Sequence, residues 1–284
     1  MKFYFSLSKL CKSGDARGSA WENMLTKGNI IQNQRLLSDA EIFDIRILAP
    51  EIARTASPGQ IVHVRCGEAQ TLRRPISICD TEGDIIRLCY EVRGKGTAYM
   101  ASLTPGMTAD VLGPSGNGFR IADSSRILLV GGGIGIYPLL SAAKAVQRSG
   151  GHAKALLGFR TAALVHLTED FLKNGISVEV STDDGSYGKA GRVTELLKSE
   201  LENSTWDAVL VCGPRPMMAA AAALAEQFQT SCQVSMEERM GCGVGACLSC
   251  VCKTLFYENQ EVTERYKRVC VDGPVFDAKE IIWS

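Results

Sequence analysis

The fold is decided by the stretch Ile127-Leu-Leu-Val-Gly-Gly-Gly-Ile-Gly-Ile-Tyr-Pro138. Four consecutive apolar residues are typical of a strand buried on both faces, and proline is tolerated in the first turn of a helix. A glycine loop between strand and helix leaves N–H groups free to bind a phosphate. The stretch therefore predicts a nucleotide-binding βα unit, with a plain tight turn as the alternative because the G-x-G-x-x-G fingerprint is absent. The loop residues expected to contact the nucleotide are Gly131, Gly132, Gly133 and Gly135.

Downstream, buried strands continue to alternate with helix-like segments. Largely apolar segments at residues 155–157, 178–180 and 208–211 predict a parallel sheet of βαβ units. Because a ligand in such a sheet lies beyond the carboxyl ends of the strands, we expect Cys212 and Gly213 to flank a nicotinamide. A strand end closed by a Gly-Pro turn is the alternative. Arg160 would suit a 2′-phosphate or a plain surface position, so the sequence leaves NAD and NADP both open.

Upstream, residues 28–121 contain short segments in which apolar and polar residues alternate, as in residues 41–48 and 60–65. This period of two is typical of half-buried strands, and Gly, Pro and Ser separate the segments. The pattern predicts a small antiparallel barrel.

Two elements of this barrel are suited to phosphate. Arg74 and Ser77 lie in Arg74-Pro-Ile-Ser77, where a guanidinium suits a pyrophosphate and a hydroxyl suits the edge of a ring. Gly96 and Thr97 follow about twenty residues later, at the start of a short helix predicted at residues 98–103. Together they favour a bound dinucleotide. A solvated basic turn and an ordinary hairpin turn are the alternatives.

The eleven cysteines require a chemical explanation. A disulfide framework is the poorer one, because the chain has no secretory signal and does not need disulfides to hold its core. Cys242, Cys247 and Cys250 have the spacing C-x4-C-x2-C, and Cys270 follows after nineteen intervening residues. This uneven spacing is typical of plant-type [2Fe–2S] sites, whereas zinc sites usually pair two short knuckles. Structural zinc and buried thiols remain alternatives. Cys252 would compete with Cys250 if the intervening chain is extended, because alternate side chains then share a face.

Composition limits the remaining possibilities. The chain has 284 residues, of which 45% are apolar, and its 31 basic and 31 acidic residues cancel. No global charge would draw it to nucleic acid or to a membrane surface, and no apolar run is long enough to span a bilayer. The first residues lack the pattern of a secretory signal. We therefore expect a soluble, cytoplasmic protein, in which residues 1–27 form a flexible extension or precede a natural start at Met24.

The set of motifs resembles the ferredoxin-reductase superfamily and, within it, the electron-transfer subunits of NAD-dependent dihydroorotate dehydrogenases. The likeness covers residues 28–284 and includes the motifs already quoted, together with residues 237–247 and 268–276. It implies a multi-domain α+β fold. The expected parts are an FAD-binding barrel at residues 28–121, an NAD-binding α/β domain at 122–235 and a [2Fe–2S] module at 236–284. A stretch at residues 255–266 makes the last cysteine spacing longer than expected of this family.

The resemblance also implies the cofactor-binding residues. FAD is expected to contact Arg74, Pro75, Ile76, Ser77, Cys89, Tyr90, Glu91, Gly96 and Thr97. The iron ligands are expected to be Cys242, Cys247, Cys250 and Cys270. No constellation marks a substrate site, so we expect the three histidines, His63, His152 and His166, to be structural or surface residues.

The function implied is electron transfer for pyrimidine biosynthesis. An FMN-containing catalytic subunit would oxidise dihydroorotate, and electrons would pass through [2Fe–2S] and FAD to NAD⁺, in a heterotetramer of two copies of each subunit. The iron–sulfur cluster, a one-electron carrier, would thereby connect two flavins that each handle two electrons. The alternatives are a flavin and [2Fe–2S] subunit of a ferredoxin:NAD(P) or sulfide-linked oxidoreductase, and a non-redox scaffold that binds zinc.

Overall fold

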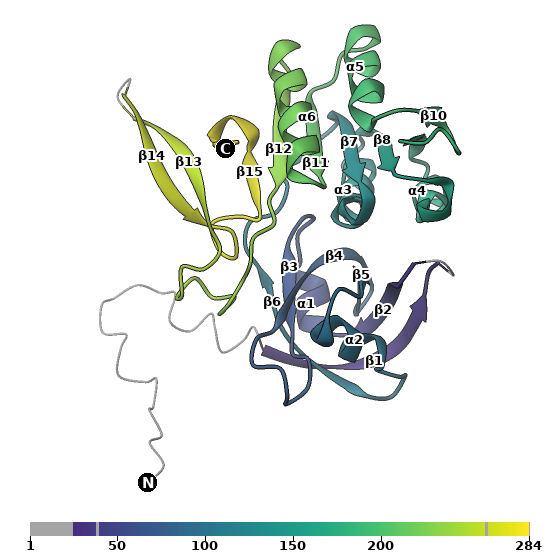
Figure 1. Ribbon diagram of the computed structural model, residues 1–284, viewed down its shortest axis with the longest axis vertical. Coiled ribbons are helices and arrows are strands. Elements are labelled where there is room, and N and C mark those ends of the chain that lie inside the picture. Colours follow the sequence, from purple (N-terminus) through teal and green to yellow (C-terminus); the bar gives the residue numbers. More distant parts are fainter. Residues whose placement is uncertain (1–24, 38–39, 259–260, 284) are drawn as a thin grey trace.

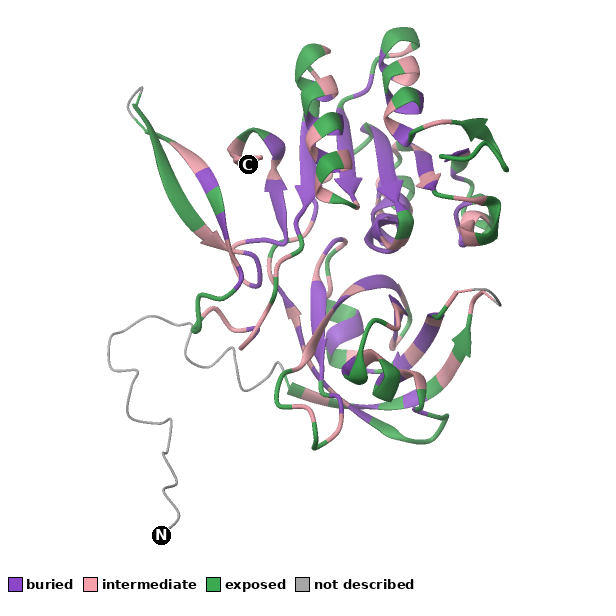
Figure 2. Ribbon diagram, viewed as in Figure 1, coloured by how far each residue is buried: buried purple, intermediate pink, exposed green. Residues whose placement is uncertain are grey.

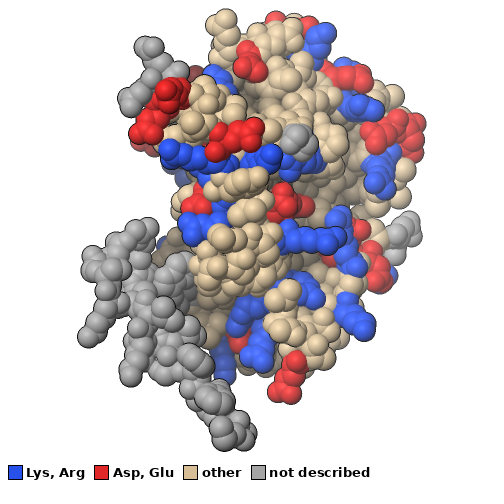
Figure 3. Space-filling model, turned by 60° about the vertical axis from the view of Figure 1, so that its left-hand side comes forward, with Lys and Arg blue, Asp and Glu red and all other residues tan. Residues whose placement is uncertain are grey.

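The computed structural model describes residues 25–37, 40–258 and 261–283 (Figure 1). An antiparallel barrel lies below a parallel sheet in this view, and a long hairpin stands beside the sheet. Buried residues are concentrated in the sheet and the barrel, whereas the hairpin is largely exposed (Figure 2). On the face shown in Figure 3, side chains of both charge signs are interspersed with uncharged surface. No helix in the described part of the chain is long and apolar enough to cross a membrane.

The barrel has the antiparallel architecture that the sequence predicts. Its strands are β1 (Leu25–Arg35), β2 (Ile42–Leu48), β3 (Ile61–Val64), β4 (Arg74–Glu82), β5 (Ile85–Glu91) and β6 (Thr108–Ser115), closed in the order β1-β2-β5-β4-β3-β6. Helices α1 (Pro50–Thr55) and α2 (Lys95–Ala101) connect them. Strand β1 begins three residues before the expected start at residue 28, and the remaining part of the predicted extension, residues 1–24, lies outside the described residues.

The sheet contains seven strands in the order β10-β9-β8-β7-β11-β12-β15. Its strands are β7 (Arg126–Gly132), β8 (His152–Phe159), β9 (Ser177–Thr182), β10 (Lys189–Ala190), β11 (Ala208–Cys212), β12 (Ser231–Ser235) and β15 (Val275–Asp277). Its helices are α3 (Tyr137–Arg148), α4 (Thr168–Lys173), α5 (Val193–Asn203) and α6 (Arg215–Gln227), with one-turn helices η3 (Gly133–Ile136) and η4 (Ala162–Leu164). The order of strands reverses beside β7, where a nucleotide is expected to bind.

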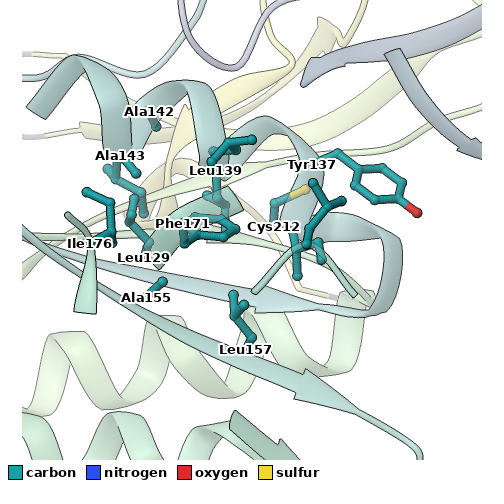
Figure 4. Close-up of a cluster of buried hydrophobic side chains, with 14 of the residues drawn as sticks. Leu129, Tyr137, Leu139, Ala142, Ala143, Ala155, Leu157, Phe171, Ile176 and Cys212 are labelled. Carbon is teal, nitrogen blue, oxygen red and sulfur yellow. The ribbon is translucent and has the colours of Figure 1, made fainter. Parts of the chain in front are cut away.

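Successive residues of the central strands pack on opposite faces of the sheet. Leu129 packs with α3 and α4, where Phe171 lies among Leu139 and Leu157 (Figure 4). Leu128 and Val130 pack instead with α5 and α6. Helices therefore cover both faces, which explains why the strand sequences are apolar throughout rather than alternating.

The C-terminal segment packs against the nucleotide-binding sheet and adds a strand to it. Strand β15 pairs antiparallel with β12 and so completes the nucleotide-binding sheet, and η5 (Ala278–Glu280) follows it. Cys250, Cys270 and Phe276 share the hydrophobic core of α5 and α6. The stretch that looked like an insertion forms a hairpin of β13 (Val251–Glu258) and β14 (Glu261–Arg268). The loop of residues 241–250, here called the cysteine loop, is therefore anchored on the sheet. The domain boundary at residue 235 stays a prediction.

Candidate functional site

A cavity of about 750 Å³ lies at the carboxyl end of the sheet, between the sheet and the barrel. Gly132, Gly133 and Gly135 line it beside β7, and Gly213 lines it at the end of β11. Glu91 and other barrel residues close the opposite side. Four of the predicted nucleotide-binding glycines thus lie together at the point where the order of the strands reverses.

The glycine loop is compact because its neighbours leave no room for side chains. A Cβ atom on Gly135 would lie 2.3 Å from the Cys212 carbonyl oxygen, and one on Gly132 would lie 2.5 Å from the Met217 sulfur. The backbone can therefore approach a ligand closely at this position. The predicted residues Gly131 and Cys212 do not line the cavity. Burial raises the pKa of the Cys212 thiol to about 12, so its side chain is a neutral part of the core.

The two predicted phosphate elements of the barrel meet in the structure. The guanidinium of Arg74 lies over Gly96, where a Cβ atom would be 2.3 Å from the Arg74 Nε atom. Arg74 donates a hydrogen bond of 2.7 Å to the Leu72 carbonyl oxygen, and no described carboxylate lies within ion-pair distance of it. The Thr97 hydroxyl accepts a 2.9 Å hydrogen bond from the Arg93 N–H group. This bond explains why α2 begins before the predicted residue 98. The guanidinium of Arg74 and the backbone at Gly96 together fit an anionic cofactor.

The remaining predicted FAD residues lie on adjacent strands. Pro75 and Ser77 are half-buried on β4, whereas the Ile76 side chain points into the core of the barrel. Tyr90 is buried and stacks on Phe43 at 5.9 Å. Cys89 is buried beside Cys79, so only its backbone is available to a ligand. Glu91 faces the cavity instead of the barrel.

The cysteine loop has a backbone suited to an anionic sulfur centre. The Cys242 sulfur accepts hydrogen bonds from the N–H groups of Val244, Ala246 and Cys247 at 3.4, 3.2 and 3.4 Å. Gly243 has a φ of +72°, a conformation that favours glycine. The Ser249 hydroxyl and backbone lower the pKa of Cys247 to about 6 through hydrogen bonds. Donors of this kind stabilise thiolates and the sulfides of iron–sulfur clusters.

The four predicted ligands form two neighbouring pairs, Cys242 with Cys247 and Cys250 with Cys270. Cys270 is within hydrogen-bonding reach of Cys250 and near Cys242, and burial raises its pKa to about 12. Cys252 is buried in β13 near Glu238 and Arg215 instead. Within the described ranges, no three His, Cys, Asp or Glu side chains converge on one metal ion. A [2Fe–2S] cluster divides its ligands between two irons, so its four thiols need not converge on one point.

The cavity also contains residues to which the sequence reasoning gave no role. Arg93 lies inside the motif that contains Gly96 and Thr97, and Glu237 follows the end of β12. Glu237 could have been recognised from the sequence, because it follows a parallel strand, as Gly213 does. Arg160 also lines the cavity.

A closed antiparallel barrel, a parallel sheet with a glycine loop and a four-cysteine segment define a flavin- and nicotinamide-dependent reductase with an iron–sulfur centre. Two family models match the chain, the iron–sulfur cluster binding domain of dihydroorotate dehydrogenase B at residues 237–282 and an oxidoreductase NAD-binding domain at residues 129–223. The dihydroorotate dehydrogenase B (NAD(+)) electron transfer subunit of Bacillus caldolyticus is 42% identical over 260 residues, which cover 89% of this chain and 96% of that protein. The chain belongs to the family of dihydroorotate dehydrogenase B electron transfer subunits.

A further relative and two solved structures are also similar to the chain. The electron transfer subunit of Caldanaerobacter subterraneus subsp. tengcongensis is 37% identical over 90% of this chain and 98% of its own length. A solved NADH-dependent reduced ferredoxin-NADP oxidoreductase matches with a TM-score of 0.79 and 31% identity, over 91% of this chain and 90% of that one. The cytochrome b5 reductase domain of Ulva prolifera nitrate reductase shares the fold, with a TM-score of 0.61 and 16% identity over 72% of this chain and 93% of its own.

The prediction of an oxidoreductase subunit that uses FAD, a [2Fe–2S] cluster and NAD is thereby confirmed. The family name also implies a separate catalytic subunit as partner.

Proposed function

We propose that this chain takes electrons from an FMN-containing catalytic subunit that oxidises dihydroorotate, and that it delivers them to NAD⁺ for pyrimidine biosynthesis. The bound flavin supplies two-electron hydride chemistry, and the iron–sulfur centre supplies one-electron transfer. The catalytic assembly proposed is a heterotetramer of two copies of each subunit in the cytoplasm. Ten described cysteines are free, which suits a reducing compartment.

The roles of the chain's own residues follow from their positions. Arg74 and the backbone at Gly96 would hold the FAD pyrophosphate, and Ser77 would hydrogen-bond the edge of the flavin ring. Gly132, Gly133 and Gly135 would let the NAD pyrophosphate approach the backbone, with Gly213 beside the nicotinamide. Cys242, Cys247, Cys250 and Cys270 would hold the two irons.

One observation carries this proposal, the contact that the cysteine loop and the turn after Cys270 make with the barrel wall. The Asn117 N–H group, just after β6, donates to the Gly273 carbonyl oxygen at 2.5 Å, and the Asn117 amide donates to the Asp272 carbonyl oxygen at 2.9 Å. Gly243 packs against His63 of β3, beside the predicted FAD-binding strand β4. The predicted cluster and flavin sites therefore adjoin one another, as successive electron transfer requires.

The partner's docking surface is proposed to be the outer face of the β13–β14 hairpin together with Leu248. Leu248 is 60% exposed and Tyr266 is 64% exposed. With Val251 and Arg268 they line a groove that joins the hairpin to the cysteine loop. Exposed apolar surface of this kind typically marks an interaction site. A catalytic subunit seated here would lie next to the predicted cluster, so we assign the groove to that subunit.

The proposal can be tested on protein purified without oxygen. We expect bound flavin and acid-labile sulfide, reduction of dyes by NADH, and dihydroorotate oxidation only after the catalytic subunit is added. Turnover of dihydroorotate by this chain alone would contradict the proposal, and so would zinc in place of iron.

Two cysteine variants test the ligand assignment. Cys247→Ser should lose acid-labile sulfide and coupling to the partner while FAD remains bound, because the barrel does not depend on the cysteine loop for its core. Cys252→Ser is the matched control and should keep the cluster, because this thiol is buried away from the other four. An intact cluster in Cys247→Ser would show that another thiol replaces it.

A second function, that of a ferredoxin:NAD(P) oxidoreductase subunit, is favoured by the 31% identity to the ferredoxin-NADP enzyme. Reduction of ferredoxin by NADPH, without any effect of a dihydroorotate-oxidising subunit, would establish it.

A further inference from the structure

His63 is a buried polar residue on the outer wall of the barrel. It lies in β3 between Val62 and Val64, whose side chains fill the barrel core. Because side chains alternate along a strand, that of His63 points outward. It is nevertheless only 1% exposed. Its burial therefore comes from chain that packs on the outside of the barrel.

The cysteine loop supplies this cover. A Cβ atom on Gly243 would lie 2.8 Å from the Cε1 and Nδ1 atoms of His63, so only glycine allows the loop to approach the ring this closely. Gly243 directly follows the predicted iron ligand Cys242. The imidazole thus packs against the backbone of the predicted cluster-binding loop.

The other side of His63 adjoins the flavin-binding strand. In the antiparallel pair of β3 and β4, His63 is opposite Pro75, and Ile61 is opposite Ser77. Directly opposite residues have side chains on the same face of a sheet. His63 and Pro75 therefore share the outer face of the barrel, so that the imidazole lies between the two predicted redox sites.

One ring nitrogen of His63 has no partner. Among the described residues nothing hydrogen-bonds to its Nε2 atom, although this atom is shielded from solvent. The adjacent guanidinium of Arg73 donates to the backbone oxygens of His63 and Asp110 instead of the ring. Buried polar atoms are nearly always paired in folded proteins, so an orphaned nitrogen beside a cofactor loop indicates a partner that arrives with the cofactor.

We propose that His63 is a positioning residue that donates its Nε2–H group to the iron–sulfur centre held by the Cys242 loop and thereby raises the reduction potential of that centre. This inference rests on the proposed function. Hydrogen bonds to the sulfurs of a cluster stabilise the reduced form, which carries more negative charge. Along the chain His63 belongs to no cysteine- or carboxylate-bearing constellation that marks a base, which is why a structural or surface role was expected of it.

The test is a redox titration of the cluster followed by electron paramagnetic resonance. His63→Phe keeps a ring but has no donor, and we expect the one-electron equilibrium between FAD and the cluster to shift roughly tenfold toward reduced FAD, about 59 mV. His63→Gln retains an N–H group and should recover much of that shift. The midpoint potential of FAD should stay unchanged in both variants. His152→Phe, at an exposed position on β8, is the matched control and should leave both potentials unchanged.

A second measurement begins with the wild-type protein. In the wild-type protein with ¹⁵N-labelled histidine, pulsed paramagnetic resonance of the reduced cluster should show a weak nitrogen coupling, and His63→Gln should abolish it. Absence of the coupling, an unchanged cluster potential in His63→Phe, or a shift confined to FAD would overturn the inference. If the wild-type protein holds no cluster at all, the proposed function fails instead.

Discussion

At the scale of single residues, two glycines on either side of Lys95 differ in what surrounds them. Gly96 is covered by the Arg74 guanidinium, whereas a Cβ atom on Gly94 would meet nothing within 4 Å. Gly94 also has an extended backbone with φ of 178°, which any residue adopts. The two positions therefore form a matched pair for testing the flavin site.

We predict that Gly96→Ala weakens FAD binding roughly tenfold, or about 1.4 kcal/mol. The added methyl group would displace Arg74 from the place where it is expected to meet the pyrophosphate. The helix itself should gain stability, because alanine is a better helix former than glycine. Titration of the apoprotein with FAD measures the effect. Gly94→Ala should bind FAD as the wild type does, and equal losses in both variants would contradict the prediction.

His166 is a second residue whose environment has a measurable consequence. It is buried in the segment before α4, where its ring nitrogens contact the Leu164 carbonyl oxygen at 2.7 Å and the Tyr137 hydroxyl at 3.0 Å. Burial lowers the pKa of His166 below its usual 6.5, and the Leu164 carbonyl and the Asp170 carboxylate offset part of that effect. The folded protein therefore favours the neutral ring.

We predict that this residue makes stability decrease as the pH falls below 6.5. In that range the unfolded chain binds a proton that the folded chain does not, so acid favours unfolding, whereas above 6.5 the contribution is constant. His166→Gln, which cannot titrate, should lose less stability than the wild type between pH 7.5 and 5.5. Urea unfolding midpoints at both pH values measure this. Equal losses in the two proteins would show that other groups account for the pH dependence.

At the scale of elements, the cysteine loop and the β13–β14 hairpin together line one exposed groove. Leu248 has a φ of +57°, a conformation that is unfavourable for leucine. A strained and exposed apolar residue beside a cofactor loop is better explained by a partner than by the stability of this chain.

We predict that Leu248→Asn weakens binding of the catalytic subunit at least tenfold. Asparagine tolerates positive φ, so the loop and the cluster should be retained. Leu172→Asn is the matched control, because Leu172 is similarly exposed on α4. Affinity can be measured by titrating one subunit into the other. Equal affinity of the Leu248 variant and the wild type would exclude this surface.

The elements that the sequence predicted well are those with a long repeating pattern. The apolar runs of β7, β8 and β11 and the alternation in β2 are intrinsic to the local sequence. Strand β15 has three residues, too few for any period, and it is positioned by pairing with β12. The hairpin was read as an insertion because it lengthens the spacing before Cys270, and the two large apolar residues of β14, Val262 and Tyr266, are both exposed.

The same distinction applies to the site. Spacing along the chain identified the cysteine and glycine motifs. The contacts of Gly96 with Arg74 and of His63 with Gly243 join segments that are far apart in sequence, and only the tertiary structure brings them together.

At the scale of the whole molecule, charged pairs fix the barrel against the sheet. Lys144 on α3 donates to Asp80 on β4 at 2.6 Å, with exposed side-chain fractions of 19% and 6%. Arg87 on β5 pairs with both Asp44 of β2 and Asp170 of α4. The cavity is lined by barrel and sheet residues alike, so we expect these pairs to affect how the two cofactors face each other.

We predict that Asp80→Asn and Lys144→Met each lower the free energy of unfolding by about 3 kcal/mol, because each leaves a largely buried charge without its partner. The double variant should lose less than the sum of the two, since it removes both charges. Each single variant should also slow the reduction of FAD by NADH, which stopped-flow absorbance measures, because the barrel and the sheet would no longer be held in register.

The exposed pair Lys198–Glu202 on α5 provides the control, and Lys198→Met should change stability by less than about 0.5 kcal/mol. If the two pairs behave alike, burial of Asp80 and Lys144 has no special importance. If the single variants lose stability but reduce FAD at the wild-type rate, the pair stabilises the fold without setting the geometry for hydride transfer. Slower flavin reduction in the single and the double variants alike would show that the relative position of the barrel and the sheet controls this step.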